Sequence, residues 1–467
     1  MNRLPDGWQR IAISDVFQVN PGHKDLDIPL DTEVTFLPMP NILEEKNAIL
    51  TDESRQYKEV KKGYTKFIEG DVLFAKITPC MENGKLAIAK GLQNELGCGT
   101  TELHVFRTTG VCSSKFLYYY LHQKDFRNYC KSQFSGAVGQ QRVSKQVFQE
   151  RKFPLPPINE QKRIVVKLDQ LFAHLDTVKD RLERIPELLK QFRQTVLTQA
   201  VTGKLTQDIP SNWRKITIDT ICKESFYGPR FSSDDYDESG IPTVRTTDMT
   251  NDGKIVITPG TPKVQVPSEK IESFRVKNGD LLITRTGSIG KMAIYNSEIV
   301  AIPSAYLIRF RFDESAINTK FLYFYLISPK GQFEMGLHST AITQPNINAK
   351  KIRSIEIPYP PLDLQKEIVH RVESLLRKSN KIEQKYQSLK EKIERLPQTI
   401  LAKAFRGELV EQYLNDEPAG ELFERIQTAK PNNLKKKKKQ VAKASATHNG
   451  HARKSEKVVG EQMRLNL

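Results

Sequence analysis

The chain repeats itself, because motifs separated by about 204 residues recur in the same order. Pro154–Pro157 returns as Pro358–Pro361, and the segment Gln194–Leu205 returns as Gln398–Leu409. Looser matches lie upstream: Trp8 with Trp213, Gly70-Asp71 with Gly279-Asp280, and Phe116–Tyr118 with Phe321–Tyr323. A direct repeat of this size predicts two related globular domains, each followed by its own helical arm.

Each arm carries an apolar seam. In the first arm, apolar residues recur from Ile164 to Val196 at spacings that alternate between four and three. The second arm has the same register from Ile368 to Ile400, with Ser379 as a polar break. This spacing is typical of a coiled coil. We expect the two arms to pack on each other; the alternative, that each packs on its own globular domain, stays open.

The arm boundaries are marked by proline and glycine. Each arm begins after a Pro-Pro turn, which holds the preceding residues extended, and ends near Gly203 or Gly407. Pro186 and Pro397 lie inside the arms at non-equivalent positions and should kink or locally break them. A helix of roughly 40 residues is about 60 Å long.

Connectivity predicts the architecture. A short linker keeps the second globular domain near the far end of the first arm, so the second arm has to run back along the first. We expect an α+β protein in which two α/β domains are held at opposite ends of a long antiparallel coiled-coil helix pair, with arms that act as a ruler. The expected boundaries are a first domain at 1–157, a first arm at 158–205, a second domain at 206–361, a second arm at 362–410, a short C-terminal helical segment at 411–430 and a basic disordered tail at 431–467.

Composition limits the class of protein. Hydrophobic residues make up 38% and charged residues 27% of the 467 residues, which fits a globular protein of two or three domains. No apolar run is long enough for a membrane span, and no signal peptide is visible. The five cysteines lack metal-binding spacing, which predicts reduced thiols and a cytoplasmic protein.

The net charge of +17 is concentrated in the tail. Residues 430–467 carry +9, so the remaining chain is only mildly basic, and the charge is weak support for a nucleic-acid partner. The tail reads either as a solubilising segment or as a nonspecific anion binder.

The globular domains are expected to be rich in short strands. Apolar runs at 71–77 and 280–285 predict strands, and each is followed by a glycine-containing loop and a second apolar run, which suggests hairpins. The aromatic segments 116–121 and 321–326 predict helices of the core; base stacking by these aromatic residues is the alternative.

Polar loops that precede the Pro-Pro turns are the favoured contact sites. They span 135–145 and 338–348 and differ between the two halves, as two different DNA-reading surfaces should. Gln and Asn pair bidentately with adenine and Arg with guanine in the major groove. Ordinary solvated loops remain the alternative for any single residue. The candidate DNA contacts from these loops and from the strand–hairpin segments are Lys76, Thr78, Asn83, Lys85, Gln140, Gln141, Arg142, Lys145, Arg285, Ser288, Lys291, Thr343, Gln344, Asn346 and Asn348.

Catalytic signatures are missing. The segment 287–292 is too short between its glycines, and lacks the Ser or Thr after Lys291, to be a phosphate-binding loop. The sequence has no Asn-Pro-Pro-aromatic motif for a flipped adenine, no GxGxxG loop for an adenosyl cofactor and no His/Cys cluster for zinc. We expect no catalytic residues and no metal site, so that any catalysis comes from partners.

The Pro-Pro-x-x-x-Gln-Lys motif before each heptad arm and the segment Gln398–Leu409 closely resemble specificity (S) subunits of type I restriction–modification systems. The resemblance covers residues 4–426, and Leu401–Leu409 is its most specific part. The first copy departs from it, with Thr202 and Lys204 where the second has Arg406 and Glu408.

The resemblance implies a noncatalytic DNA-recognition subunit. Its two target recognition domains would each read one half of an asymmetric bipartite site in double-stranded DNA, and the arms would set the gap. The implied partners are two modification (methyltransferase) subunits and two restriction (motor-nuclease) subunits. They would supply the S-adenosylmethionine, ATP and Mg²⁺ chemistry and direct it to adenine methylation and restriction. The alternative is a two-domain protein-binding adaptor spaced by a coiled coil, without a membrane partner.

Overall fold

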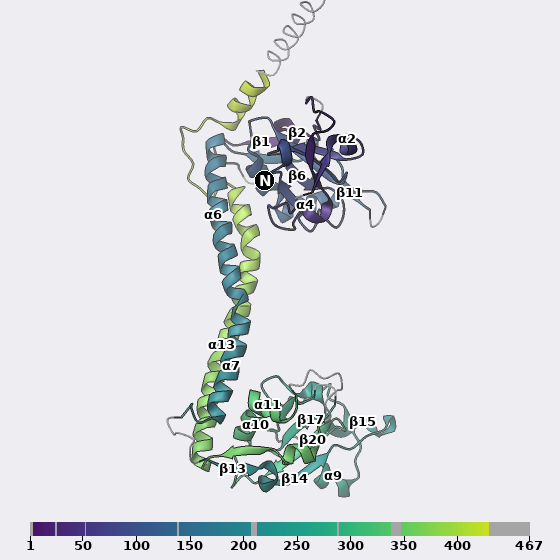
Figure 1. Cartoon of the computed structure of the whole chain (residues 1–467), viewed down its shortest axis with the longest axis vertical. Helices are drawn as coiled ribbons and strands as arrows, with labels where there is room; N and C mark the ends of the chain where they lie inside the picture. Colours follow the sequence, from purple (N-terminus) through teal and green to yellow (C-terminus); the bar gives the residue numbers. More distant parts are fainter. Residues whose placement is uncertain are drawn as a thin grey trace, which may run out of the picture. The chain divides into compact units, whose positions relative to one another are not determined.

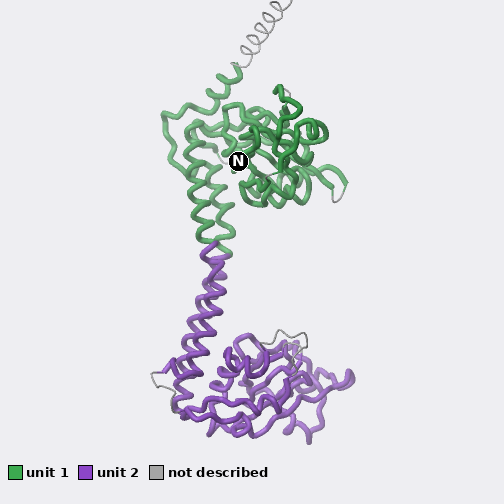
Figure 2. Tube along the Cα trace, viewed as in Figure 1, with its two compact units in different colours: residues 1–179, 391–467 green, residues 180–390 purple. Residues whose placement is uncertain are grey.

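The structure is a computed structural model that describes residues 3–23, 26–51, 53–137, 140–206, 213–286, 289–337 and 347–428. The chain divides into two compact units, residues 1–179 with 391–467 and residues 180–390 (Figure 2). Each unit contains one α/β domain together with parts of both arms. The long helix α13 (Leu362–Ala404) contributes residues to both units.

The domain of the first unit is built on two four-stranded sheets (Figure 1). One has the order β2-β9-β6-β7, and the other, β4-β3-β8-β5, contains the parallel pair β3–β8. A further antiparallel pair joins β1 to β12. The elements are β1 (Gln9–Ala12), α1 (Ile13–Val16), β2 (Phe17–Val19), β3 (Glu33–Leu37), η1 (Met39–Asn41), β4 (Ser54–Gln56), α2 (Tyr57–Val60), β5 (Thr65–Ile68), β6 (Val72–Ala75), β7 (Leu86–Ile88), η2 (Gln93–Glu95), β8 (Leu96–Gly99), β9 (Leu103–Thr108), α3 (Ser114–Leu121), α4 (Lys124–Ser132), β10 (Phe134–Ser135), β11 (Arg142–Val143), α5 (Val147–Glu150) and β12 (Lys152–Leu155).

The second unit repeats this plan. Its sheet β14-β20-β17-β18 has the same order as β2-β9-β6-β7, and its β15–β19 pair is parallel like β3–β8. The elements are β13 (Arg214–Thr217), α8 (Ile218–Ile221), β14 (Cys222–Tyr227), η4 (Ser233–Asp235), β15 (Tyr236–Val244), η5 (Thr246–Asp248), β16 (Lys263–Val264), α9 (Ser268–Phe274), β17 (Leu281–Thr284), β18 (Met292–Ile294), β19 (Ile302–Pro303), β20 (Leu307–Phe312), α10 (Thr319–Ile327), α11 (Pro329–Glu334), α12 (Ala349–Arg353) and β21 (Glu356–Tyr359). The sequence repeat is therefore a repeat of domains.

The predicted strands and core helices are confirmed. All four residues of β6 and all four of β17 are buried, as expected for the unbroken apolar runs of central strands. The antiparallel neighbours β7 and β18 form the predicted hairpin partners. Helices α3 and α10 bury their aromatic residues in the cores, which favours core packing over base stacking.

The repeated Gly-Asp motif holds a buried ion pair in each domain. The Asp71 carboxylate accepts two hydrogen bonds from Arg107, at 2.9 and 2.8 Å, and the Asp280 carboxylate accepts two from Arg311, at 2.9 and 2.7 Å. Each aspartate also accepts a hydrogen bond from the backbone N–H three residues before it, that of Ile68 or Lys277. Because each carboxylate is almost fully buried, loss of Arg107 would leave the Asp71 charge uncompensated, whereas Asp280 would keep a more distant arginine, Arg309, at 3.9 Å.

The first arm is two helices, α6 (Ile158–Glu183) and α7 (Ile185–Val201). The break lies at Arg184, just before Pro186, where proline is tolerated in a first helical turn. Pro397 lies inside α13, which continues through it, so only Pro186 coincides with the start of a new helix. Gly203 and Gly407 follow the helix ends with φ of 71° and 76°, the left-handed conformation that favours glycine.

In the second unit, α7 and α13 run antiparallel. The Arg193 Nε donates to the Ser379 hydroxyl at 3.0 Å, and its Nη2 bonds Glu383 at 2.5 Å. Further along, Arg371 donates to the Leu205 carbonyl oxygen at 2.9 Å. The polar break in the seam at Ser379, which is fully buried, is therefore matched by an arginine of the facing helix.

The arms also pack on the domains, so both of the packing modes considered from the sequence occur. In the first unit, Ile164 and Leu168 of α6 share a core with Leu401 of α13 and with Phe116 of α3. In the second unit, Leu197 and Ala200 of α7 share a core with Ile368 and Val372 of α13. Each domain is thus held by the start of one arm and the end of the other.

A buried glutamine fixes the start of each arm to its domain. Gln161 donates to the carbonyl oxygens of Val111 and Pro156 and accepts the Ser113 N–H. Gln365 donates to the Pro360 carbonyl oxygen and accepts the Asn318 N–H. Both side chains are fully buried, which explains why this glutamine recurs in the two copies.

Beyond α13, a further helix spans 419–428. The Arg163 Nη2 bonds the Asp416 carboxylate at 2.6 Å, which ties the segment before this helix to α6. All five cysteines are free thiols, as expected. None of the helices in the described ranges is long and apolar enough to cross a membrane. The basic tail lies outside the described residues.

Candidate nucleic-acid interface

One candidate residue of each domain directly follows the central strand, at its carboxyl end. Lys76 follows β6, and its N–H donates to the Glu102 carbonyl oxygen at 3.0 Å. Arg285 follows β17, and its N–H donates to the Tyr306 carbonyl oxygen at 3.0 Å. The first bond extends the β6–β9 pair and the second extends the corresponding β17–β20 pair. Lys76 and Arg285 are therefore structural equivalents, as are Glu102 and Tyr306. We call this edge the rim of each domain.

In the first domain, the rim carries an arginine–carboxylate pair. Arg142 forms two hydrogen bonds with Glu102, Nε to Oε2 and Nη2 to Oε1, both of 2.9 Å. The Arg142 guanidinium lowers the pKa of the Glu102 carboxyl from its usual 4.5. The fork that the sequence assigned to guanine therefore faces an internal carboxylate, which DNA would have to displace or share.

The neighbouring candidates of the first domain divide into anchored and exposed residues. The Thr78 N–H donates to the Gln141 carbonyl oxygen at 3.0 Å, which ties the rim to the loop 135–145. Asn83 is exposed but bonds Glu44 at 3.1 Å. Gln140 and Lys145 are exposed, and neither side chain forms a hydrogen bond or an ion pair with another described residue. These two have the freest polar side chains of the predicted set.

The two hairpin lysines serve the fold. The Lys85 ammonium donates to the carbonyl oxygens of Met39 and Ile42 at 3.2 and 3.1 Å. The Lys291 ammonium donates to those of Thr246 and Met249, at 3.4 and 2.6 Å. In each domain this lysine closes the short 3₁₀ turn after a strand, so little of either ammonium is left for DNA.

In the second domain, the rim carries an arginine against an aromatic ring. The Arg285 guanidinium carbon lies 5.1 Å from the centroid of the Tyr227 ring, within the range of a cation–π contact. Tyr306, which directly precedes β20, is 61% exposed. Asn348 caps α12, because its side chain accepts the Lys351 N–H at 2.8 Å. Ser288, Thr343, Gln344 and Asn346 lie outside the described residues.

Sequence reasoning missed Glu102, Tyr227 and Tyr306. An acidic residue is an unpromising DNA contact by charge alone, and the two tyrosines lie far from the polar loops in the sequence. The signal that finds them is alignment of the two halves, because Leu103 and Leu307 begin equivalent strands and Glu102 and Tyr306 precede them.

A basic turn of the first domain also went unnoticed. Lys58 of α2, Lys61 and Lys62 of the following turn and Lys66 of β5 form no ion pair within the described part of the chain. Four unpaired ammonium groups in nine residues favour contact with phosphates, which position DNA without reading its sequence.

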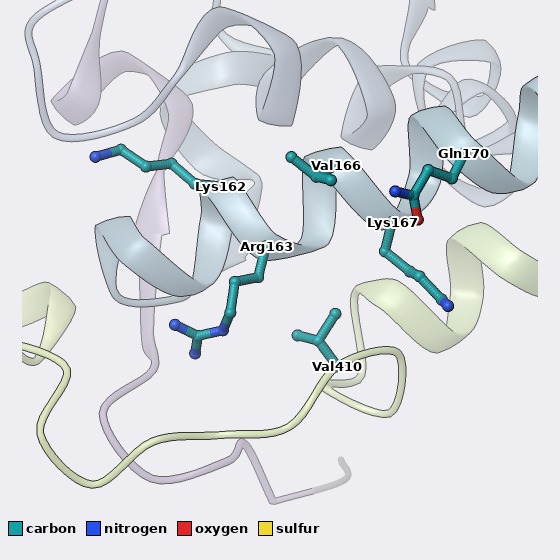
Figure 3. Close-up of a pocket in the computed structure, with 6 residues that line it drawn as sticks. All are labelled: Lys162, Arg163, Val166, Lys167, Gln170 and Val410. Atoms are coloured by element: carbon teal, nitrogen blue, oxygen red, sulfur yellow. The ribbon is translucent and has the colours of Figure 1, made fainter.

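The hollow with the best-defined lining in the described part of the chain lies on the first arm. A surface hollow of about 350 Å³ lies against α6 (Figure 3), lined by Lys162, Arg163, Val166, Lys167, Gln170 and Val410. These side chains are basic, amide or aliphatic, so the lining offers neither a carboxylate pair nor a nucleophile. Across the described ranges, no group of three or more His, Cys, Asp or Glu side chains could hold a metal ion.

Both the sequence and the fold of the chain match known proteins. The sequence matches the family model "Type I restriction modification DNA specificity domain" twice, over residues 5–187 and 210–395. It is 28% identical over 451 residues to the type I restriction enzyme EcoKI specificity subunit of Escherichia coli, covering 89% of this chain and 92% of that protein. It is 35% identical over 216 residues to the EcoAI specificity subunit of Escherichia coli, covering 46% of this chain but only 36% of that protein.

Among solved structures, the fold is similar to the crystal structure of the HsdS subunit from Thermoanaerobacter tengcongensis. The TM-score is 0.65 at 21% identity, and the match covers 87% of this chain and 98% of that one. The two family matches coincide with the two repeated domains and most of their arms. The chain therefore belongs to the type I restriction–modification DNA specificity family.

Proposed function

We propose that this chain is the noncatalytic DNA sequence-recognition subunit of a type I restriction–modification complex. Each domain would read one half of an asymmetric bipartite site in double-stranded DNA. The observation that carries the proposal is that the two domains share a strand order but differ in the residues of their rims. The same strand order supports both domains, whereas the rim holds an Arg142–Glu102 pair in one and an Arg285–Tyr227 contact in the other.

Two different rims on one frame suit two different half-sites. Arginine pairs with guanine and Gln140 would pair with adenine, while a glutamate can accept a hydrogen bond from the amino group of cytosine. The lysine-rich turn of the first domain would contribute phosphate contacts. A protein-binding adaptor explains neither the family match nor the unpaired basic groups.

The arms would join the two domains and bind the catalytic partners. The arm helices expose several large apolar side chains, each between 40% and 59% exposed: Leu188 and Phe192 of α7, and Ile382 and Leu389 of α13. Exposed apolar side chains grouped on helices favour a protein interface. We propose two modification and two restriction subunits as partners. They would act in the cytoplasm with S-adenosylmethionine, ATP and Mg²⁺ bound to them, and the arm length would set the gap between half-sites.

Salt dependence of DNA binding tests the proposal. The chain, combined with its modification subunits, should bind duplex DNA with an affinity that falls linearly on a log–log plot against salt concentration. Variants Lys61→Gln and Lys62→Gln together should reduce the slope by about one to two units, because each phosphate contact contributes roughly 0.9. Binding with no salt dependence would favour the adaptor instead.

A further inference from the structure

Arg285 differs from most other arginines of its domain in having no polar partner. Arg309 and Arg311 bond Glu224, Arg245 bonds Asp248, and Arg353 bonds Asp219. No hydrogen bond or ion pair joins the Arg285 guanidinium to any other residue in the described ranges, and it lies over the face of the Tyr227 ring. Its N–H groups are therefore available to a ligand.

The surrounding contacts hold this guanidinium in place. The Tyr227 hydroxyl accepts the Ala349 N–H at 2.9 Å, which anchors the ring that lies against Arg285. The next residue, Gly228, packs so closely on the turn before β20 that a Cβ there would lie 2.0 Å from the Ser304 carbonyl oxygen. The Arg285 backbone is itself bonded to Tyr306 across the same rim. The arginine is thus fixed at its backbone and supported on its side chain.

Granted the DNA-recognition function proposed above, we propose that Arg285 reads a guanine in the half-site bound by the second domain. A guanidinium fork presents two parallel N–H donors that match O6 and N7 of guanine in the major groove. Stacking on an anchored ring restricts the fork before DNA arrives, so less conformational freedom is lost on binding. The exposed Tyr306 ring lies at the same edge, where apolar contact with neighbouring bases supports the register.

The first domain shows why this position is specific to one half-site. Its equivalent of Arg285 is Lys76, and its equivalent of Tyr306 is Glu102, which engages Arg142. The first rim therefore presents the Lys76 ammonium next to an arginine–carboxylate pair, whereas the second presents the Arg285 guanidinium fork against the Tyr227 ring. Arg285 should determine one base pair of the second half-site and none of the first.

The experiment uses the full chain reconstituted with its modification subunits and measures which adenine-methylated sequences form in a random-sequence DNA library. Arg285→Ala should lower the preference for guanine at one position of the second half-site by about 5- to 140-fold. Arg285→Gln should shift the preferred base at that position from guanine to adenine, because glutamine pairs bidentately with adenine. Arg285→Lys keeps the charge and should keep the affinity while losing part of the discrimination.

Arg230→Ala is the matched control, because Arg230 is an exposed arginine of the same domain. It should leave every base preference unchanged. If Arg285→Ala weakened methylation equally at all sequences and lowered the salt slope by about one, Arg285 would be a phosphate contact and the proposal would be wrong. A wild-type complex that methylates no defined bipartite sequence would instead overturn the proposed function.

Discussion

The side-chain amide of Gln161 donates a hydrogen bond of 3.0 Å to the carbonyl oxygen of Pro156, at the turn where the first arm leaves its domain. Gln365 makes the equivalent bond of 2.8 Å to Pro360. The Pro-Pro turn thus exposes a carbonyl oxygen that the helix cannot satisfy, and the glutamine one turn later satisfies it. The pairing ties the direction of each arm to the domain that precedes it.

Gln161→Leu is expected to destabilise the first unit by about 2 kcal/mol or more, because buried carbonyl and N–H groups lose their partner. The two tryptophans, Trp8 and Trp213, lie one in each unit. With Trp213 replaced by Phe, the fluorescence of Trp8 reports the unfolding of the first unit alone, and the converse replacement isolates the second unit. Denaturant unfolding followed by Trp8 fluorescence should shift to lower midpoint. Gln170→Leu, an exposed position on the same helix, is the control. Equal midpoints for both variants would show that the glutamine is dispensable.

Arg193 and Ser379 should be coupled. Removal of the Ser379 hydroxyl by Ser379→Ala leaves one donor of Arg193 without its acceptor and should cost about 1 kcal/mol, since Arg193 is partly exposed and keeps Glu383. In a double-mutant cycle with Arg193→Met, denaturant unfolding followed by Trp213 fluorescence should give a coupling energy clearly different from zero. Strict additivity would mean that the polar break does not fix the seam register.

The Arg142–Glu102 pair predicts a pH dependence. Arg142 lowers the folded-state pKa of Glu102 below 4.5, so the pair stabilises the fold above that pH, and the contribution is lost as the pH falls through the lowered pKa. Acid unfolding should therefore begin at higher pH in Arg142→Met, where nothing holds the carboxylate ionised. Wild type and variant with the same acid midpoint would contradict a stabilising role.

The exposed loop of the first domain should affect the first half-site alone. Gln140→Ala with Arg142→Ala is expected to cost about 1–3 kcal/mol at specific base pairs of that half-site. Gln344→Ala with Asn346→Ala should act in the same way on the second half-site. Competition binding with single-base-pair variants of the methylated sequence measures the effect, and a uniform loss over all variants would mark these residues as phosphate contacts or fold supports.

Much of the fold could be predicted from the sequence. Local periodicity reveals the arm seam, and the repeat reveals the paired domains, because both signals follow from burial. The roles of Lys85 and Lys291 could not be predicted, since a lysine that closes a turn and a lysine that binds DNA have the same sequence signal. Glu102 and Tyr306 were missed because their importance comes from neighbours across the sheet, which periodicity does not identify.

Methylation profiling of a domain exchange tests the central claim, that each domain reads one half of a bipartite site. Residues 1–155 are replaced by the equivalent domain of a related specificity subunit, and methylated adenines are mapped in host DNA with the exchanged gene, the original gene and neither. We expect a bipartite methylated sequence that depends on the gene and that changes in only one half after the exchange. A change in both halves, or methylation that persists without the gene, would contradict it.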